Sequence, residues 1–138
     1  AIFLVYVAGI VASPTAGAFA DRFGRPRVLA GGVALTALGL AVTLADSIGA
    51  IVVGIALLTA GFFAVHTVAG GWVGARAKGE KAHASSLYLL AYYLGSSVMG
   101  SAGGLFWTEA GWGGVVAFVA VLLAVEAALA VVLARDGG

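Results

Sequence analysis

The charged side chains of this sequence gather in a few short segments, and the densest of these runs from Gly17 to Arg27. The segment reads G-A-F-A-D-R-F-G-R-P-R and carries Asp21, Arg22 and Arg25 besides Arg27. Charges are costly in hydrocarbon, so the segment is predicted to lie in water between two membrane spans. An aspartate at the end of a helix meets the negative end of the helix dipole and needs a compensating charge, which the arginines can supply.

A second group of chemically capable residues lies inside an apolar run. His66 and Thr67 are its conspicuous polar pair, and an ionisable group within a membrane is a candidate functional group. His66 either takes part in binding protons or substrate, or is a neutral histidine hydrogen-bonded between helices. Tyr92, at helical spacing from Tyr88, either reaches a cavity or packs between helices.

No catalytic residue, metal site or cofactor is predicted. The two histidines, His66 and His83, lie far apart, and there is no cysteine to support them. The glycine-rich runs lack the lysine of a phosphate-binding loop. An intramembrane enzyme would need several catalytic groups at the same depth in the membrane, and the sequence supplies only His66 and Glu126. Glu126 is predicted to make an interhelical hydrogen bond or to face its own helix bundle.

The composition of the chain indicates a membrane protein. Of its 138 residues, 62% are hydrophobic and 9% are charged, with a mean hydropathy of +1.12; soluble domains are about 25% charged. A spanning helix needs about 20 apolar residues, and the sequence offers five such runs. The prediction is an all-α membrane protein with spans at about 1–20, 26–45, 49–75, 82–107 and 113–134. Pro26 is expected in the first turn of the second span, and Pro14 is expected to kink or break the first.

The positions of the cations orient these spans. All seven lysines and arginines fall in the first connection, in the third connection (76–81) or after the last span, at Arg135. The alternate turns, predicted at Asp46–Ser47 and Thr108–Glu109, hold none. Because Lys and Arg accumulate on the cytoplasmic side, these connections and the C-terminus are predicted to be cytoplasmic. Trp72 nears the inner membrane boundary, as interfacial aromatic residues do.

The segment from Gly17 to Arg27 resembles the cytoplasmic loop of the major facilitator superfamily, whose pattern is G-x-x-x-D-[RK]-x-G-[RK]-[RK]. Gly17, Asp21, Arg22, Gly24 and Arg25 match it, whereas proline occupies the last position and the next arginine comes one residue late. In the family the pattern lies between helices 2 and 3 and, in a weaker form, between helices 8 and 9. Four predicted spans follow it here, which fits both placements.

The end of the chain favours the second placement. After the fifth span it stops at Arg135-Asp136-Gly137-Gly138, where a long cytoplasmic loop would be expected after helix 6. The runs 66–75 and 86–104 are also similar to the end of multidrug and sugar efflux members. The chain is therefore predicted to be a fragment that holds helices 8 to 12 of a twelve-helix transporter and lacks the N-terminal half.

The resemblance implies a mechanism. Substrate would bind near the midplane between two six-helix halves that rock to alternate access. The third span would line the central cavity, and the first and fourth would face the other half. The loop would act as a latch that closes the cytoplasmic side, with the N-terminus of a helix from the other half compensating Asp21 and Gly17 letting that helix approach closely. The alternative is that the arginines only determine topology.

Span four carries small residues at Gly95, Gly100, Gly103 and Gly104. They resemble the glycine-rich face that efflux members use between the halves, although the proline of that motif is absent. Ordinary close packing of helices within one half is an equal alternative.

The predicted function is export of small molecules, drugs or sugars, by proton antiport across a plasma membrane of the bacterial inner-membrane type. The partners expected are the substrate, protons, lipid and the N-terminal half, and the net charge of +1 gives no hint of nucleic acid. A non-transporting membrane scaffold or an intramembrane enzyme is the alternative.

Overall fold

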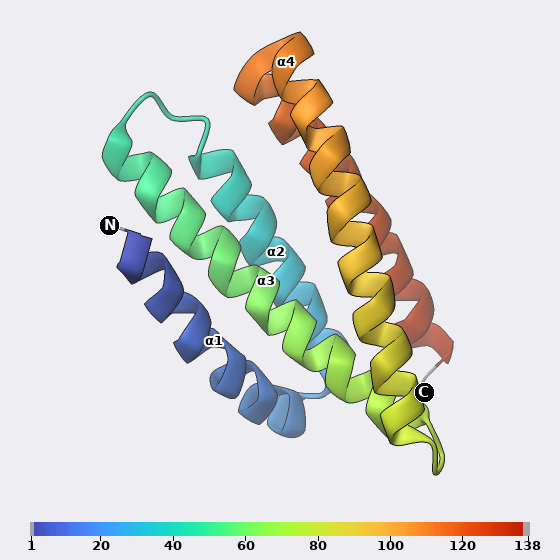
Figure 1. Cartoon of the computed structure of the whole chain (residues 1–138). Helices are drawn as coiled ribbons and strands as arrows, with labels where there is room; N and C mark the ends of the chain where they lie inside the picture. Colours follow the sequence, from blue (N-terminus) through green and yellow to red (C-terminus); the bar gives the residue numbers. More distant parts are fainter. Residues whose placement is uncertain (1, 137–138) are drawn as a thin grey trace. The chain divides into compact units, whose positions relative to one another are not determined.

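The chain forms helices joined by short connections. The computed structural model describes residues 2–136, and Figure 1 shows its four helical elements. They are α1 (Ile2–Phe23), α2 (Arg25–Val42), α3 (Ile48–Arg76) and α4 (Lys81–Asp136). The all-helical class predicted from the apolar runs is confirmed.

The five-span count is not confirmed, although a break between the fourth and fifth predicted spans is present inside α4. The fourth and fifth predicted spans belong to one element, α4, whose only non-helical residue is Gly111 (φ 61°, ψ −151°). The rings of Phe106 and Phe118 stack with centroids 4.7 Å apart, whereas twelve residues of straight helix would separate them by about 18 Å. The chain therefore reverses at Gly111, as the orange part of α4 in Figure 1 shows. The predicted turn is present but lies at Gly111 and not at Thr108–Glu109, because both of these residues belong to the helix before the reversal.

Within the described residues, three of the helices are long and apolar enough to cross a membrane: α2, α3 and α4 as far as Arg135. The first predicted span falls on α1, which is not among these three, and it stays a prediction. The helix α1 runs through Pro14 without interruption, so it does not break at this proline, and the alternative, a kink, stays a prediction.

The connections are tighter than the sequence suggested. Gly24 alone separates α1 from α2, with φ 90° and ψ 142°, and Pro26 lies in the first turn of α2 as predicted. Residues 21–27 were expected to form a loop, but all except Gly24 are helical. Before α3, the hydroxyl of Ser47 accepts a hydrogen bond from the amide of Ala50 at 3.1 Å and caps the helix.

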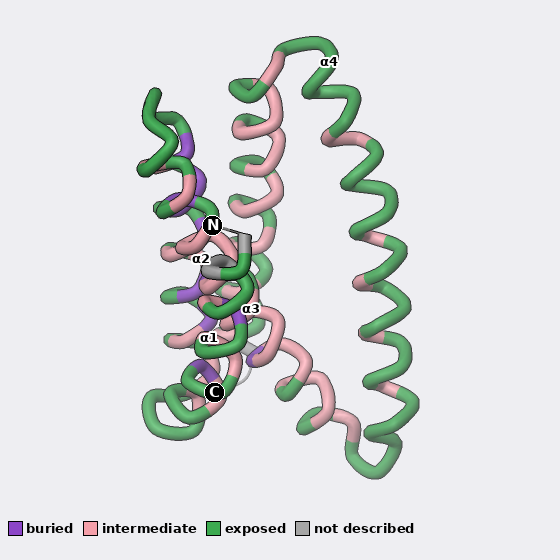
Figure 2. Tube along the Cα trace, turned by 60° about the vertical axis from the view of Figure 1, so that its left-hand side comes forward, coloured by how far each residue is buried: buried purple, intermediate pink, exposed green. Residues whose placement is uncertain are grey.

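The chain divides into two units, each described here by itself. The first unit takes α1, α2, α3 as far as Val68 and α4 from Ala120; the second is Ala69–Val119. In the first unit α1 packs against α2. The buried residues lie in α1, α2 and α3 and at Thr43, directly after α2, and α4 has none among its described residues (Figure 2).

The closest packing in the first unit is the seam between α2 and α3. A Cβ atom added to Gly39 would collide with the amide of Leu58 and lie 2.7 Å from the carbonyl oxygen of Gly54. One added to Gly61 would lie 2.6 Å from the amide of Thr36. Such backbone contact is how small residues join helices in lipid, where no hydrophobic force draws helices together. The seam is formed by Gly32, Thr36 and Gly39 of α2, and Thr43 directly after it, with Gly54, Leu58, Gly61 and Val65 of α3.

Candidate functional site

The candidate latch is built on the junction of α1 and α2. Asp21 and Arg22 lie in the last turn of α1, and Arg25 opens α2. Between them Gly24 has a positive φ, which non-glycine residues rarely adopt. Asp21 and Arg22 are exposed, and Arg25 is half-buried. The junction therefore presents its charged side chains at one end of a helical hairpin.

Asp21 has no ion pair with any residue that the structure describes. The guanidinium of Arg22 lies instead over the ring of Phe23, 5.3 Å from the ring centroid, and the Phe23 ring in turn lies 5.7 Å from that of Phe19. The compensating role that the sequence allowed to Arg22 and Arg25 is thus not seen here. The carboxylate stays at the C-terminal end of α1, where the helix dipole disfavours it.

Gly17 lies one turn before Asp21 on α1. A Cβ atom added there would have no neighbour within 4 Å among the described residues. The surface beside Gly17 is therefore open, in contrast to the closed seam of α2 and α3.

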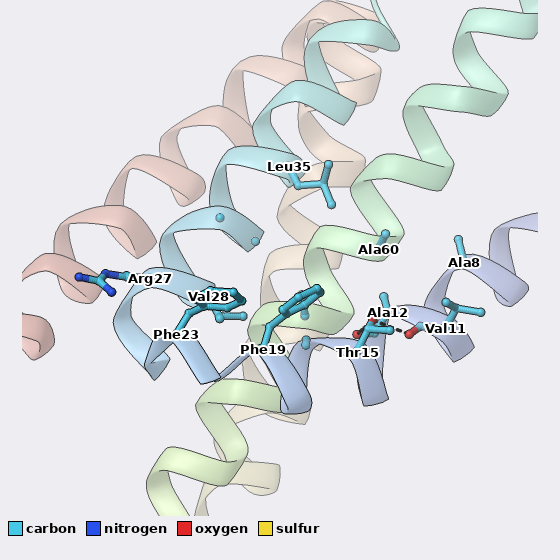
Figure 3. Close-up of a pocket in the computed structure, with 14 residues that line it drawn as sticks. Ala8, Val11, Ala12, Thr15, Phe19, Phe23, Arg27, Val28, Leu35 and Ala60 are labelled. Carbon is cyan, nitrogen blue, oxygen red and sulfur yellow. Dashed lines mark hydrogen bonds between the residues drawn. The ribbon is translucent and has the colours of Figure 1, made fainter. Parts of the chain in front are cut away.

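A groove runs between α1, α2 and α3 in the first unit (Figure 3). Its volume is about 720 Å³. The hydroxyl of Thr15 donates to the carbonyl oxygens of Val11 (2.6 Å) and Ala12 (3.0 Å), so it is engaged by its own helix. Arg27 lies at one end, close to Phe23 (Figure 3). The groove therefore offers apolar surface with a cation at the α1–α2 junction.

This groove was not predicted from the sequence. The signal that could have revealed it is a row of small residues on one face of α1, at Ala8, Ala12, Thr15 and Ala16. Facing small residues, Ala60 and Ala64, lie on α3. Small side chains on neighbouring helices leave space when the helices do not come into contact.

The candidate substrate and proton residues lie in both units. His66 and Thr67 are half-buried in α3, in the first unit. The His66 ring stacks on that of Phe62, with centroids 5.7 Å apart and an interplanar angle of 15°. Tyr92 belongs to the second unit, is half-buried, and meets Tyr93 edge-on at 5.2 Å. No group of three or more metal-ligating side chains occurs among the described residues.

The glycines of α4 are mostly open. A Cβ atom on Gly95, Gly100 or Gly104 would meet nothing within 4 Å in the described part of the chain. Gly103 differs, because its Cβ would lie 3.8 Å from the ring of Phe118. Gly114 packs more closely across the reversal at Gly111, because its Cβ would lie 2.7 Å from the Cβ of Ala110 and 2.8 Å from the carbonyl oxygen of Phe106.

Long apolar helices joined by short connections, with the charges gathered at the ends of helices, define an integral membrane protein of the helical-bundle class. The family model described as Major Facilitator Superfamily matches residues 1–137. The chain belongs to this superfamily, and the resemblance read from the α1–α2 junction is confirmed.

Curated relatives support the same assignment. The chain is 45% identical over 135 residues to YybF of Bacillus subtilis (strain 168), named an uncharacterised MFS-type transporter; the match covers 98% of the chain and 33% of the relative. It is 46% identical over 122 residues to the inner membrane transport protein YnfM of Escherichia coli (strain K12), covering 88% and 29%. An uncharacterised transporter of Buchnera aphidicola (subsp. Schizaphis graminum) is 39% identical over 120 residues, covering 87% and 29%. No solved structure matches the chain at a significant level.

The chain spans about a third of the length of these relatives. Membership of a family of transporters confirms the prediction that the chain is not an enzyme and removes the intramembrane enzyme as an alternative. The family and the apolar helices also place the chain in a membrane.

Proposed function

We propose that the chain is part of a transporter that moves small molecules across the bacterial inner membrane by alternating access. It forms most of the C-terminal six-helix half, with helices 8 to 12, and works with an N-terminal half. Transport is export of drugs or sugars by proton antiport, and the C-terminus is cytoplasmic. The family and the names of the relatives support transport in general; direction, coupling and substrate class are part of the proposal.

The observation that carries the proposal is the state of the α1–α2 junction. Asp21 is exposed, lies against the unfavourable end of the α1 dipole, and has no ion pair among the described residues. One turn away, Gly17 leaves open surface. An uncompensated carboxylate beside open surface suits a contact with the N-terminus of a helix from the other half. The junction then acts as the latch formed by Gly17, Asp21, Arg22, Gly24, Arg25 and Arg27.

Two further groups have roles in the proposal. His66 and Thr67 on α3 contact protons or substrate at the centre of the transporter, together with Tyr92 on α4. The face of α4 that carries Gly95, Gly100 and Gly104 packs against the other half, which agrees with the open space beside these glycines. Gly103 contributes to packing within the chain as well.

Transport by the full-length protein tests the latch through Asp21→Asn. The substitution removes the charge and keeps the shape, so uptake of a fluorescent drug into everted membrane vesicles should fall about tenfold, the size of a typical coupling energy. Asp46→Asn is the matched control, because Asp46 is exposed in the opposite connection, and it should transport like the wild type. Full transport by Asp21→Asn would contradict the latch, whereas no transport by the wild type would contradict the function.

A further inference from the structure

Three of the four lysines and arginines outside the latch segment gather at the connection of α3 and α4, and no role has yet been given to them. We call Arg76, Lys78, Lys81 and His83 the basic turn. Arg76 ends α3, Lys78 lies in the connection, and the other two lie in the first turn of α4. All four side chains are exposed, and the one acidic residue among them is Glu80. All lie in the second unit.

The backbone brings these cations together at one end of a helical hairpin. Gly79 has a φ of 111°, and the amide of Glu80 donates to the carbonyl oxygen of Ala77 at 2.7 Å, which closes a tight turn. The two helices already lie side by side further from the turn, because a Cβ on Gly70 would approach the Tyr88 ring to 3.4 Å. The cations therefore converge on one small surface.

The charges of the basic turn are not neutralised within the described part of the chain. Neither Arg76 nor the two lysines form an ion pair there. The guanidinium of Arg76 lies 5.4 Å from the ring centroid of Trp72, in a cation–π contact. Three cations against one carboxylate leave a positive surface, and the first amides of α4 add to it.

The surroundings of this surface are apolar. Trp72 lies one turn inside Arg76, and tryptophan favours the boundary between headgroups and hydrocarbon. On α4, Leu87, Leu90 and Leu94 follow the basic residues at helical spacing and are exposed. A free anion would make no favourable contact with these leucines, whereas the acyl chains of a lipid would pack along them.

We propose that the basic turn binds the headgroup of an anionic phospholipid in the leaflet that it faces. Arg76, Lys78 and Lys81 hold the phosphate, and the leucines of α4 contact the acyl chains. Clustered cations next to a membrane helix attract anionic lipid in proportion to their number. The inference concerns binding of lipid and does not depend on the direction or coupling of transport.

Binding is tested on the purified full-length protein in detergent, with native mass spectrometry as the readout. The probes are dioleoyl-phosphatidylglycerol, dioleoyl-phosphatidylcholine and inorganic phosphate. The tightest phosphatidylglycerol site should lose at least about tenfold in affinity in the triple variant Arg76→Gln/Lys78→Gln/Lys81→Gln. Arg135→Gln, which removes another exposed cation, should leave that site unchanged.

A second variant, Glu80→Gln, tests lipid binding independently of whether the triple variant folds. It keeps every cation and removes the one carboxylate, so affinity for phosphatidylglycerol should rise about two- to fivefold. Equal binding of phosphatidylglycerol and phosphatidylcholine, or unchanged affinity in both variants, would overturn the proposal. Displacement of the lipid by inorganic phosphate would also overturn it, by assigning the surface to a free anion. Because no transport is measured, failure of the proposed function would leave this result unaffected.

Discussion

Asp21 carries its charge at the end of a helix whose own dipole opposes it. Exposure to water keeps this arrangement tolerable, and Arg22 is turned toward Phe23 instead of toward the carboxylate. A residue placed in this way gains most from a partner that brings positive charge from outside the chain. The physical argument for the latch therefore rests on one side chain.

The glycines provide a test at the scale of single residues. Gly61→Ala should destabilise the protein by about 1–3 kcal/mol, because its Cβ would lie 2.6 Å from the amide of Thr36 and 2.7 Å from the carbonyl oxygen of Gly32. These are backbone atoms, so relief requires the helices to separate. Thermal unfolding in detergent measures the effect. Gly71→Ala on the same helix has open space and should cost nothing; equal destabilisation by both would contradict the described seam.

His66 is tested against the only other histidine of the chain. His66→Gln keeps a polar side chain but cannot change charge, so accumulation of substrate driven by a pH gradient should largely disappear. Exchange of labelled for unlabelled substrate, which needs no gradient, should persist. His83→Gln should behave like the wild type in both assays. Gradient-driven accumulation that survives in His66→Gln would assign His66 to packing against Phe62.

At the scale of elements, the reversal inside α4 depends on the backbone conformation of a single residue. Gly111 has φ 61° and ψ −151°, a region that is essentially restricted to glycine. Gly111→Ala should therefore destabilise the protein by about 1–3 kcal/mol, measured by thermal unfolding. Gly113→Ala, two residues later and in open space, is the control. A neutral result for Gly111→Ala would mean that the helix reverses elsewhere.

The helices themselves could be predicted because long apolar runs leave no other structure for a chain in lipid. Their ends could not be predicted so well. The charged residues Asp21 and Arg22 favour a loop by their type, yet a helix end can hold charges in water while its backbone stays helical, as it does through Phe23. The polar pair Thr108–Glu109 likewise read as a turn, but the reversal follows the residue with the freest backbone, Gly111.

The latch segment and its residue types could be recognised from local spacing alone. The groove of Figure 3 and the seam of α2 and α3 could not, because both depend on which faces meet across separate helices. Gly39 and Gly54 are fifteen residues apart, and nothing in the sequence states that they touch. Small residues can be assigned to such contacts only once the arrangement of the helices is known.

At the scale of the whole molecule, the distribution of cations makes a prediction about topology. Single cysteines at Arg27 and Lys78 should react with an impermeant reagent from the cytoplasmic face, and a cysteine at Ser47 should react from the opposite face. The chain contains no cysteine of its own, which makes the labelling of this region simple to interpret. Labelling of positions 27 and 78 from opposite faces would contradict the proposed arrangement of spans.

The junction at Gly24 also limits how this part of the transporter can deform. A single residue spans less than about 4 Å, so the ends of α1 and α2 are tied together there. The groove between them is bounded near this tie by Phe23 and Val28 and at its far end by Ala8 and Leu35. If the groove widens, α1 and α2 must therefore pivot about Gly24, so that their separation changes least at this junction and most at the far end.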